Sequence, residues 1–172
     1  MRTLRIGLCQ INTTVGDIEG NTRKILDYIA QGKKMGTDLL VFPEMAVTGY
    51  PPEDLLLMPK FIEANLKAIN RIAKATSSIT AVVGFVDKKG DIFNSAAILH
   101  NGKMIDVYSK TFLPNYGVFD EDRYFQPGKE NFIFALRSTP IGPSICEDVW
   151  YPCDPIRTGG TKGAGANLMG TC

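Results

Sequence analysis

Hydrophobic residues recur at helical spacing in two stretches of the chain and form strand-like runs elsewhere. The helical spacing predicts helices over 21–35 and 59–75. Short apolar runs predict strands over 4–11 and 38–42, and the run DLLVF at 38–42 is continuous, as in strands buried on both faces. The first part of the chain therefore reads strand, helix, strand, helix.

Beyond the second predicted helix the pattern is mostly that of strands. Turn signals at Lys89-Gly90 and Asn101-Gly102 separate three of them, which we expect to pair antiparallel. The predicted strands cover 79–87, 92–100, 103–109, 132–136 and 140–145. This order predicts an α/β domain whose mixed sheet is covered by helices on one face. We expect a second sheet against the other face, with too few residues after 146 to complete it.

The last fifteen residues differ from the rest. They contain five glycines, and each interior glycine would cost a helix about 1 kcal/mol relative to alanine. The triplet Gly163-Ala164-Gly165 matches neither a Walker loop nor a complete GxGxxG motif, because Leu168 stands where the last glycine would be. The tail therefore predicts neither a helix nor a phosphate-binding loop.

Composition and charge narrow the function classes. A chain of 172 residues with 44% hydrophobic and 22% charged residues is expected to form one globular domain. The 19 basic and 18 acidic residues are mixed, so we expect no nucleic-acid partner. Polar residues interrupt the apolar run of MRTLRIGLCQIN, and no window is apolar enough to span a membrane. We therefore expect no membrane partner and a cytoplasmic location.

Cysteine and histidine usage limits the available mechanisms. The cysteines Cys9, Cys146, Cys153 and Cys172 form no CxxC pair, so reduced thiols and no metal site are expected. The single histidine, His100, precedes the Asn101-Gly102 turn and is expected to be an exposed turn neighbour. A cysteine nucleophile would therefore need a base other than histidine.

Three predicted strands end at residues with reactive side chains. LLVFPE ends at Glu44, MIDVYSK at Lys110 and PIGPSIC at Cys146. Ligand sites of open α/β sheets form outside the carboxyl ends of strands, so these three groups are expected to converge on one crevice. Each residue also has an ordinary structural interpretation, as a solvated carboxylate, a solvated ammonium and a small core side chain.

If the three groups converge, their chemistry suits acyl transfer from an amide. A thiol with an ordinary pKa of about 8.5 needs a base, and Glu44 is the candidate. Lys110 and the backbone N–H that follows Cys146 would stabilise an oxyanion. Cys146 would attack the carbonyl carbon, ammonia would leave, and water activated by Glu44 would hydrolyse the thioester. Neither metal nor cofactor is required for this reaction.

These residues stand in segments that resemble a known family. LLVFPEMAVTGYPPEDLL, YSKTFLPNYGVFDEDRYF and SICEDVW resemble the nitrilase-like carbon-nitrogen hydrolases, and among them the glutaminase domain of glutamine-dependent NAD synthetases. The resemblance covers about residues 2–157 and implies a Glu44 base, a Lys110 oxyanion partner, a Cys146 nucleophile and a supporting Glu121. Tyr50, Tyr116 and Glu147 match positions expected around glutamine.

The resemblance also implies partners and cofactors. In this family ammonia from L-glutamine passes to a synthetase domain, which uses ATP and Mg to amidate nicotinic acid adenine dinucleotide. Residues 1–172 are expected to be a partial glutaminase domain without that synthetase domain, needing no cofactor of its own. We also expect a homo-oligomer, because nitrilase-like proteins commonly associate.

The family fold is a four-layer αββα sandwich, and the sequence is expected to cover roughly its first half. Such a chain would be a fragment of a longer protein or a truncated product, with an open sheet edge and an uncovered apolar face. Two other functions stay open on the sequence: an amidase or nitrilase acting on another small amide, and an inactive truncated fragment.

Overall fold

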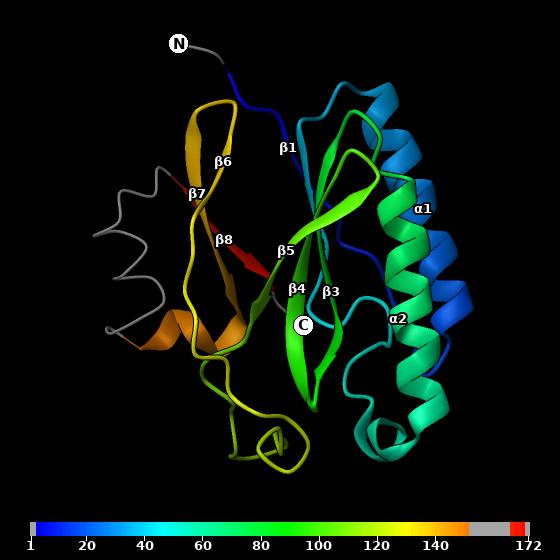
Figure 1. Ribbon diagram of the computed structural model, residues 1–172, viewed down its shortest axis with the longest axis vertical. Coiled ribbons are helices and arrows are strands. Elements are labelled where there is room, and N and C mark those ends of the chain that lie inside the picture. The colour runs from blue at the N-terminus through cyan, green and yellow to red at the C-terminus, as the bar shows by residue number, and fades with distance from the viewer. Residues whose placement is uncertain (1–2, 152–165, 171–172) are drawn as a thin grey trace.

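Two sheets and two long helices form three layers in the computed structural model, which describes residues 3–151 and 166–170 (Figure 1). A five-stranded sheet lies in the middle, both long helices cover one face, and a three-stranded sheet lies on the other. The elements are β1 (Ile6–Leu8), α1 (Ile18–Lys34), β2 (Leu39–Val41), η1 (Glu53–Leu57), α2 (Pro59–Lys74), β3 (Thr80–Lys89), β4 (Asp91–His100), β5 (Lys103–Ser109), β6 (Phe134–Leu136), β7 (Thr139–Ile145), η2 (Cys146–Trp150) and β8 (Ala166–Gly170).

The helices form where the sequence supplies caps and an apolar face. Asp17 caps α1, because its side chain accepts a hydrogen bond of 2.9 Å from the Gly20 N–H. The helix α2 begins at Pro59, where the missing N–H costs nothing in the first turn. Its buried stripe of Ile62, Ile69 and Ile72 lies at helical spacing and packs toward the central sheet.

The central sheet combines parallel and antiparallel strands in the order β1-β2-β3-β4-β5. The strands β1, β2 and β3 run parallel, with helices as connections, and β3, β4 and β5 form antiparallel hairpins. The core under the helices joins side chains of α1 and α2 to Phe42, Val83 and Leu99. This arrangement confirms the predicted mixed sheet with helices on one face.

The second sheet has the order β6-β7-β8 and packs on the opposite face of the first. Ile141 and Ile145 of β7 pack against Val41, Ile98 and Tyr108 of the central sheet. The strand β8 pairs parallel with β7. The predicted second sheet is therefore present in the part of the chain that the structure describes, and it joins β7 to the core beside β2 and β5.

The structure differs from the sequence expectation at a few elements. The helix α1 starts three residues before the predicted boundary, because Asp17 provides the cap. The strand β8 had no sequence signal, since its place depends on pairing with β7 rather than on local pattern. His100 is half-buried at the end of β4, where its Nδ1 lies 2.9 Å from the Thr80 hydroxyl, so the expectation of an exposed turn residue is wrong. The Gly163-Ala164-Gly165 segment lies outside the described residues.

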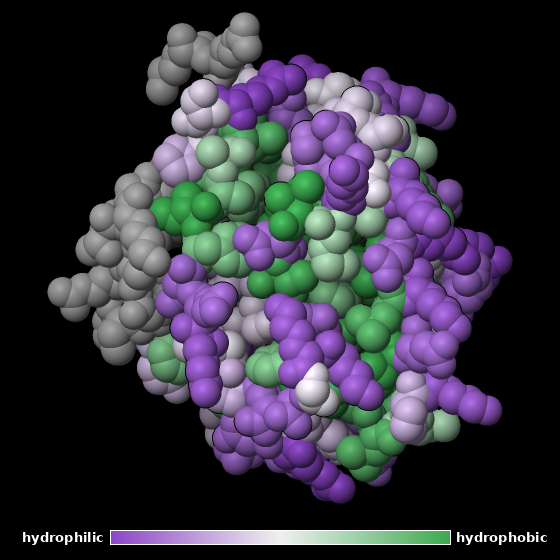
Figure 2. All heavy atoms as spheres, in the orientation of Figure 1, coloured by the Kyte–Doolittle hydropathy of each residue, from purple (hydrophilic) through white to green (hydrophobic). Residues whose placement is uncertain are grey.

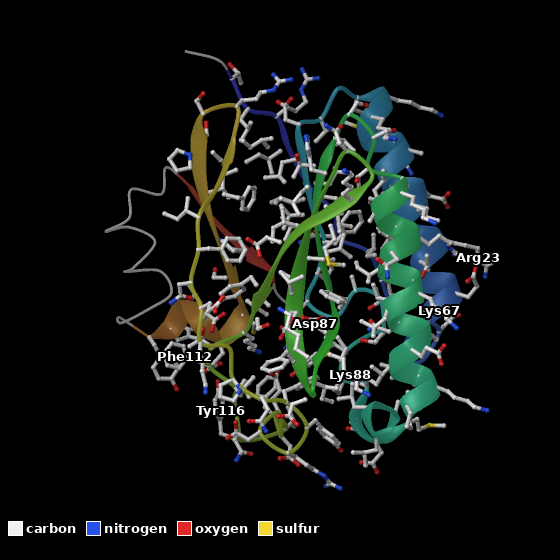
Figure 3. All side chains as sticks on the ribbon, viewed as in Figure 1. Arg23, Lys67, Asp87, Lys88, Phe112 and Tyr116 are labelled. Carbon is white, nitrogen blue, oxygen red and sulfur yellow. The ribbon has the colours of Figure 1, made fainter. Side chains whose placement is uncertain are left out.

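The surface of the helix layer is more polar than the surface over the strands (Figure 2). In the space-filling view, hydrophilic side chains cover the helix layer, and apolar side chains reach the surface over the strands (Figure 2). Arg23 and Lys67 project from the helices, whereas Phe112 and Tyr116 lie near the ends of the strands (Figure 3). Within the described ranges, no helix has the length and apolar character needed to cross a membrane.

Candidate active site

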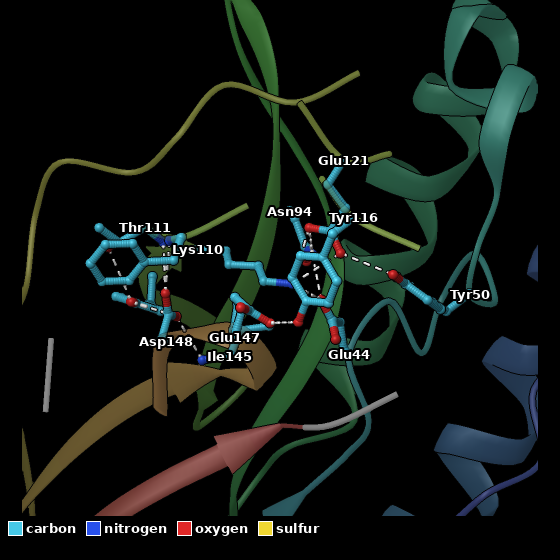
Figure 4. A network of polar contacts seen from close by, with 12 residues as sticks. Glu44, Tyr50, Asn94, Lys110, Thr111, Tyr116, Glu121, Ile145, Glu147 and Asp148 are labelled. Atoms are coloured by element: carbon cyan, nitrogen blue, oxygen red, sulfur yellow. Dashed lines mark hydrogen bonds and ion pairs between the residues drawn. The ribbon is translucent and has the colours of Figure 1, made fainter. Parts of the chain in front are cut away.

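Ends of strands from both sheets meet around one buried polar cluster (Figure 4). Glu44 follows β2 and Lys110 follows β5, and their side chains touch. Cys146 follows β7, whose last residues Ser144 and Ile145 line a narrow cavity together with Glu44. As predicted, Glu44 and Lys110 come together, and their side chains are in direct contact. The last residues of β7 line a cavity with Glu44, so Cys146, which follows them, lies at the same end of the strands.

The turn after β2 fixes the position of Glu44. Its backbone lies directly against β3 at Gly84, where an added Cβ atom would overlap the Pro43 carbonyl oxygen and the Met45 nitrogen. Only glycine permits so close an approach of two backbones. Glu44 is 3% exposed, so the turn places its carboxyl group in the interior.

Lys110 bridges two glutamates. Its Nζ lies 2.8 Å from Glu44 Oε1 and 3.0 Å from both carboxylate oxygens of Glu121. Lys110 is 1% exposed and Glu121 is 5% exposed. A turn holds Glu121 in place, because the N–H of Phe125 bonds to its carbonyl at 2.9 Å and the Phe125 ring is buried beside it. The cluster thus joins the loop 111–131 to the ends of β2 and β5.

The electrostatics of this cluster favour proton uptake by Glu44. Burial raises the pKa of Glu44, and the neighbouring charge of Glu121 raises it further, while Lys110 and Asn94 act in the opposite direction. Burial would lower the pKa of Lys110, but the two carboxylates outweigh burial and raise it. With Lys110 charged, one ammonium faces two carboxyl groups, so the cluster is short of one positive charge.

One carboxylate oxygen of the cluster has no hydrogen-bond partner among the described residues. Glu44 Oε2 is buried and has no hydrogen-bond partner among the described residues, whereas Oε1 accepts bonds from Lys110 and from Asn94. An open pocket of about 630 Å³ is lined by Glu44 and Tyr50, together with residues 10–13 and Pro43. Burying an acceptor without a donor is costly, so Oε2 is the atom at which a ligand or water would be bound.

Cys146 is the first residue of η2, at a sharp turn directly after β7. Its φ angle of +40° lies in the left-handed region, which costs a non-glycine residue about 1–2 kcal/mol. Such a conformation persists only where the surroundings hold it, and it is often found at functional sites. The side chain of Cys146 is half-buried.

Asp148 ties this turn to the strand that carries Lys110. Its Oδ1 accepts bonds from the N–H groups of Thr111, at 3.1 Å, and Phe112, at 3.0 Å. Its Oδ2 accepts from the Ile145 N–H at 2.9 Å and from the Tyr108 hydroxyl at 2.8 Å. Burial raises the pKa of Asp148, and these hydrogen bonds act against that rise. Asp148 therefore links residues on both sides of Lys110 to the residue before Cys146.

The expected substrate contacts lie around the cluster. The Tyr50 hydroxyl donates a bond of 3.0 Å to Glu121 Oε1, and the Tyr116 hydroxyl donates one of 3.0 Å to Glu147 Oε2. That bond raises the pKa of Tyr116. Tyr116 is largely exposed, whereas Glu147 is buried. Tyr50 thus contacts the charged cluster directly, and Tyr116 and Glu147 form a separate pair next to Cys146.

The other cysteines and the histidine do not join the cluster. Cys9 is buried, and burial raises its pKa to about 11, as expected for a core thiol. His100 is six residues along β4 from Asn94, roughly 20 Å in an extended strand. Cys153 and Cys172 lie outside the described residues. Within the described part of the chain, no group of three or more acidic, cysteine or histidine side chains could hold a metal ion.

Asn94 and Asp148 belong to this network and were not predicted. Asn94 donates 2.6 Å and 3.2 Å bonds to the two glutamates of the cluster. The sequence does carry a signal for it, because Asn94 alternates with Ala96 and Ile98 and so falls on an apolar face of β4. Asp148 has no comparable signal, since an acidic residue after a strand is ordinary.

The chain is similar to known proteins over most of its length. The carbon-nitrogen hydrolase family profile matches residues 5–164. The glutamine-dependent NAD(+) synthetase of Thermotoga maritima is 44% identical over 157 residues, which cover 90% of this chain and 27% of that protein. The solved glutamine-dependent NAD+ synthetase of Acinetobacter baumannii gives a TM-score of 0.93 at 36% identity, over 98% of this chain and 32% of that one.

A smaller enzyme has the same fold. A solved mutant of the amidase from Nesterenkonia sp. AN1 gives a TM-score of 0.82 at 25% identity, over 98% of this chain and 67% of that chain. The present chain spans less than a third of the two synthetases. The predicted family and its nitrilase-like α/β fold are confirmed. The chain belongs to the carbon-nitrogen hydrolase family.

Proposed function

We propose that the chain hydrolyses the side-chain amide of L-glutamine to glutamate and ammonia. The observation that carries the proposal is the buried Glu44–Lys110–Glu121 cluster, in which Glu44 Oε2 has no hydrogen-bond partner among the described residues. Glutamine as the substrate is supported by the similarity to glutamine-dependent NAD synthetases. The carbon-nitrogen hydrolase family supports cleavage of this type of bond.

The proposed reaction has two halves. The Cys146 sulfur attacks the amide carbon while Glu44 takes the thiol proton, and Glu44 then gives this proton to the departing nitrogen, so that ammonia leaves and a thioester remains. Water next attacks the thioester and gives a proton to Glu44, which returns it to the thiolate as glutamate leaves. The raised pKa of Glu44 suits both directions of proton transfer.

Lys110 acts mainly through its charge. Its Nζ already contacts Glu44 and both oxygens of Glu121, so its three N–H groups point at carboxylates. In a buried site, a fixed positive charge still stabilises a developing oxyanion over a few ångströms. Its raised pKa keeps Lys110 protonated throughout the reaction. Glu121 holds Lys110 in place, and its Oε1 atom also accepts a hydrogen bond from the Tyr50 hydroxyl.

Recognition of glutamine rather than of a simple amide would depend on its α-substituents. The buried carboxylate of Glu147 is suited to the α-ammonium group, and the Tyr116 hydroxyl beside it is suited to the α-carboxylate. Tyr50 lines the open pocket that leads to Glu44. We assign these three residues to substrate binding.

The relatives suggest a longer context for the reaction. In a longer protein, ammonia would pass to a synthetase domain that uses ATP and Mg to amidate nicotinic acid adenine dinucleotide, in the cytoplasm. The glutaminase half needs no cofactor, because Cys146 and Glu44 supply the nucleophile and the base. Homo-oligomer formation stays a prediction, to be measured by light scattering.

Ammonia release from glutamine tests the proposal. We expect hydrolysis that Cys146→Ala abolishes and that Glu44→Gln reduces at least a thousandfold, while Cys9→Ser, which changes a buried core thiol outside the cluster, retains it. Absence of glutamine hydrolysis by a folded wild-type chain would contradict the proposal and favour an inactive fragment.

A second function, that of a small-amide amidase, is favoured by one comparison. The Nesterenkonia amidase has an active-site cysteine to which acrylamide adds. Butyramide separates the two functions, because it is glutamine without its α-ammonium and α-carboxylate groups. A glutaminase should prefer glutamine at least a hundredfold in kcat/KM and lose that preference in Glu147→Gln. Equal kcat/KM values for the two substrates in the wild type would favour the amidase.

A further inference from the structure

Asn94 contacts both carboxylates of the cluster. It is the fourth residue of β4, directly opposite Lys110 across the antiparallel pair, where the Lys110 N–H bonds to the Asn94 carbonyl at 2.8 Å. Opposite residues of such a pair point to the same face of the sheet. The Asn94 Nδ2 atom lies 2.6 Å from Glu44 Oε1 and 3.2 Å from Glu121 Oε2. Asn94 therefore lies inside the cluster rather than at its border.

The orientation of the Asn94 amide follows from its neighbours. An amide nitrogen has two N–H donors, and here each points to one carboxylate. The reversed amide would place its oxygen against two carboxylate oxygens. The Asn94 Oδ1 atom is buried and has no hydrogen-bond partner among the described residues. An orphan acceptor costs about 1–3 kcal/mol, so packing alone does not explain an asparagine here.

The charge balance of the cluster explains why neutral donors are needed. Glu44 is faced by Lys110 from the end of β5, by Glu121 from the loop 111–131 and by Asn94 from β4. From the second sheet, the residues before Cys146 line the same cavity. One ammonium cannot balance two buried carboxylates. The two N–H groups of Asn94 stabilise the remaining negative charge without adding a group that titrates.

We propose that Asn94 is a positioning residue that acts through Glu44. It holds Oε1 so that Oε2 faces the reacting groups, and its hydrogen bond favours the ionised form of Glu44 against the effect of burial. This role of Asn94 rests on the proposed function in one respect, which is that Glu44 acts as the base. Its effect on the ionisation of Glu44 does not depend on turnover.

Two substitutions separate this role from a packing role. Asn94→Leu has nearly the same shape and removes both donors, and Asn94→Asp replaces the donors by a third acid. Both should move the acidic limb of kcat/KM for glutamine hydrolysis to higher pH, by about one unit for leucine and by more for aspartate. At pH 7 we expect kcat to fall at least tenfold while KM changes less than threefold.

Asn65 provides a matched control. It is fully buried in α2, but its side chain bonds only to the backbone of Val86, at 2.6 Å and 3.2 Å. Asn65→Leu and Asn65→Asp should reduce stability and leave the acidic limb in place. If Asn94→Leu does not fold, Asn94→Ser replaces it, since its short hydroxyl can donate only one bond and should still shift the limb upward.

A direct titration makes the result independent of catalysis. The pKa of Glu44 is measured by ¹³C NMR on protein with carboxyl-labelled glutamate, with the resonance assigned by Glu44→Gln. A higher pKa of Glu44 in the folded Asn94 variants supports the role of Asn94 even if the wild type does not hydrolyse glutamine. An unchanged pKa of Glu44 and an unchanged acidic limb in the folded variants would overturn it.

Discussion

Replacing Lys110 by methionine should show how much the buried cluster contributes to the free energy of unfolding. Lys110→Met keeps the length of the side chain and removes the charge that lies 2.8 Å from Glu44 and 3.0 Å from Glu121. Removing one partner of a buried ion pair costs about 3–5 kcal/mol, because the other charge is left without compensation. Here two carboxylates lose their shared partner, so we expect a loss at the upper end of that range at pH 8.

The loss should depend on pH in a defined direction. Without Lys110, the folded variant is expected to hold a proton on the Glu44–Glu121 pair that the unfolded chain, with ordinary carboxyl pKa values of about 4.3, has released. The folded state then binds more protons than the unfolded state between about pH 5 and 8, so the stability of Lys110→Met should fall as the pH rises across that range. The fall should be smaller in the wild type, because the charge of Lys110 lowers the pKa of Glu44 against the effect of burial.

Lys67 provides a control pair of similar geometry. Its Nζ lies 2.6 Å from Glu63, but its side chain is 75% exposed. Exposed pairs contribute about 0.2–1 kcal/mol, so Lys67→Met should change the free energy of unfolding by less than about 1 kcal/mol at every pH. Urea unfolding followed by far-UV circular dichroism at pH 5, 6, 7 and 8 measures both variants. Equal losses for Lys110→Met and Lys67→Met, or a Lys110→Met loss that does not change with pH, would refute the reasoning.

The remaining predictions concern the turns and the ionisation of the site. Gly84→Ala would press a Cβ atom against the backbone before Glu44, so kcat should fall at least tenfold, with a loss of about 1–3 kcal/mol in unfolding free energy. Gly32→Ala, whose Cβ atom would meet the buried side chain of Leu40 instead of that backbone, should keep kcat, and an equal kcat in both variants would contradict this account. Asp148→Asn should slow iodoacetamide alkylation of Cys146 at least tenfold, measured by peptide mass spectrometry; an unchanged rate would show that the Asp148 hydrogen bonds do not hold the cysteine turn. Because burial raises the pKa of Glu44, glutamine hydrolysis should decline as the pH falls through a midpoint above the ordinary glutamate pKa of about 4.3, and a midpoint at or below that value would argue against Glu44 as the base.

Local patterns in the sequence were enough to predict most of the fold. The apolar stripe of α2 and the turns at Lys89-Gly90 and Asn101-Gly102 are local signals, and the structure has the helix and both hairpins at those places. The strand β8 could not be predicted, because glycine-rich segments have weak intrinsic preferences and β8 is defined by its pairing with β7. The position of β8 was therefore set by its pairing with β7, which is distant in the sequence, and not by its local sequence pattern.

The candidate site divides in the same way. Glu44 and Lys110 follow predicted strands, so the topology of the sheet was enough to place them together. Asn94 enters the cluster because β4 runs antiparallel and begins at the edge where β5 ends. Asp148 contributes through a backbone group just after β5 and one in β7, which no spacing in the sequence reveals. The contacts that hold the cluster were therefore harder to predict than the groups that would react.

Covalent labelling by a glutamine analogue tests the central claim most directly. The purified chain is treated with a chloroketone analogue of L-glutamine, and the adduct is measured by intact mass and located by peptide mapping. We predict one adduct, on Cys146, that L-glutamine prevents, that butyramide does not prevent, and that Glu44→Gln slows at least a hundredfold. Labelling that glutamine does not prevent, or labelling of Cys9 at a rate equal to that of Cys146, would contradict a glutamine-hydrolysing site.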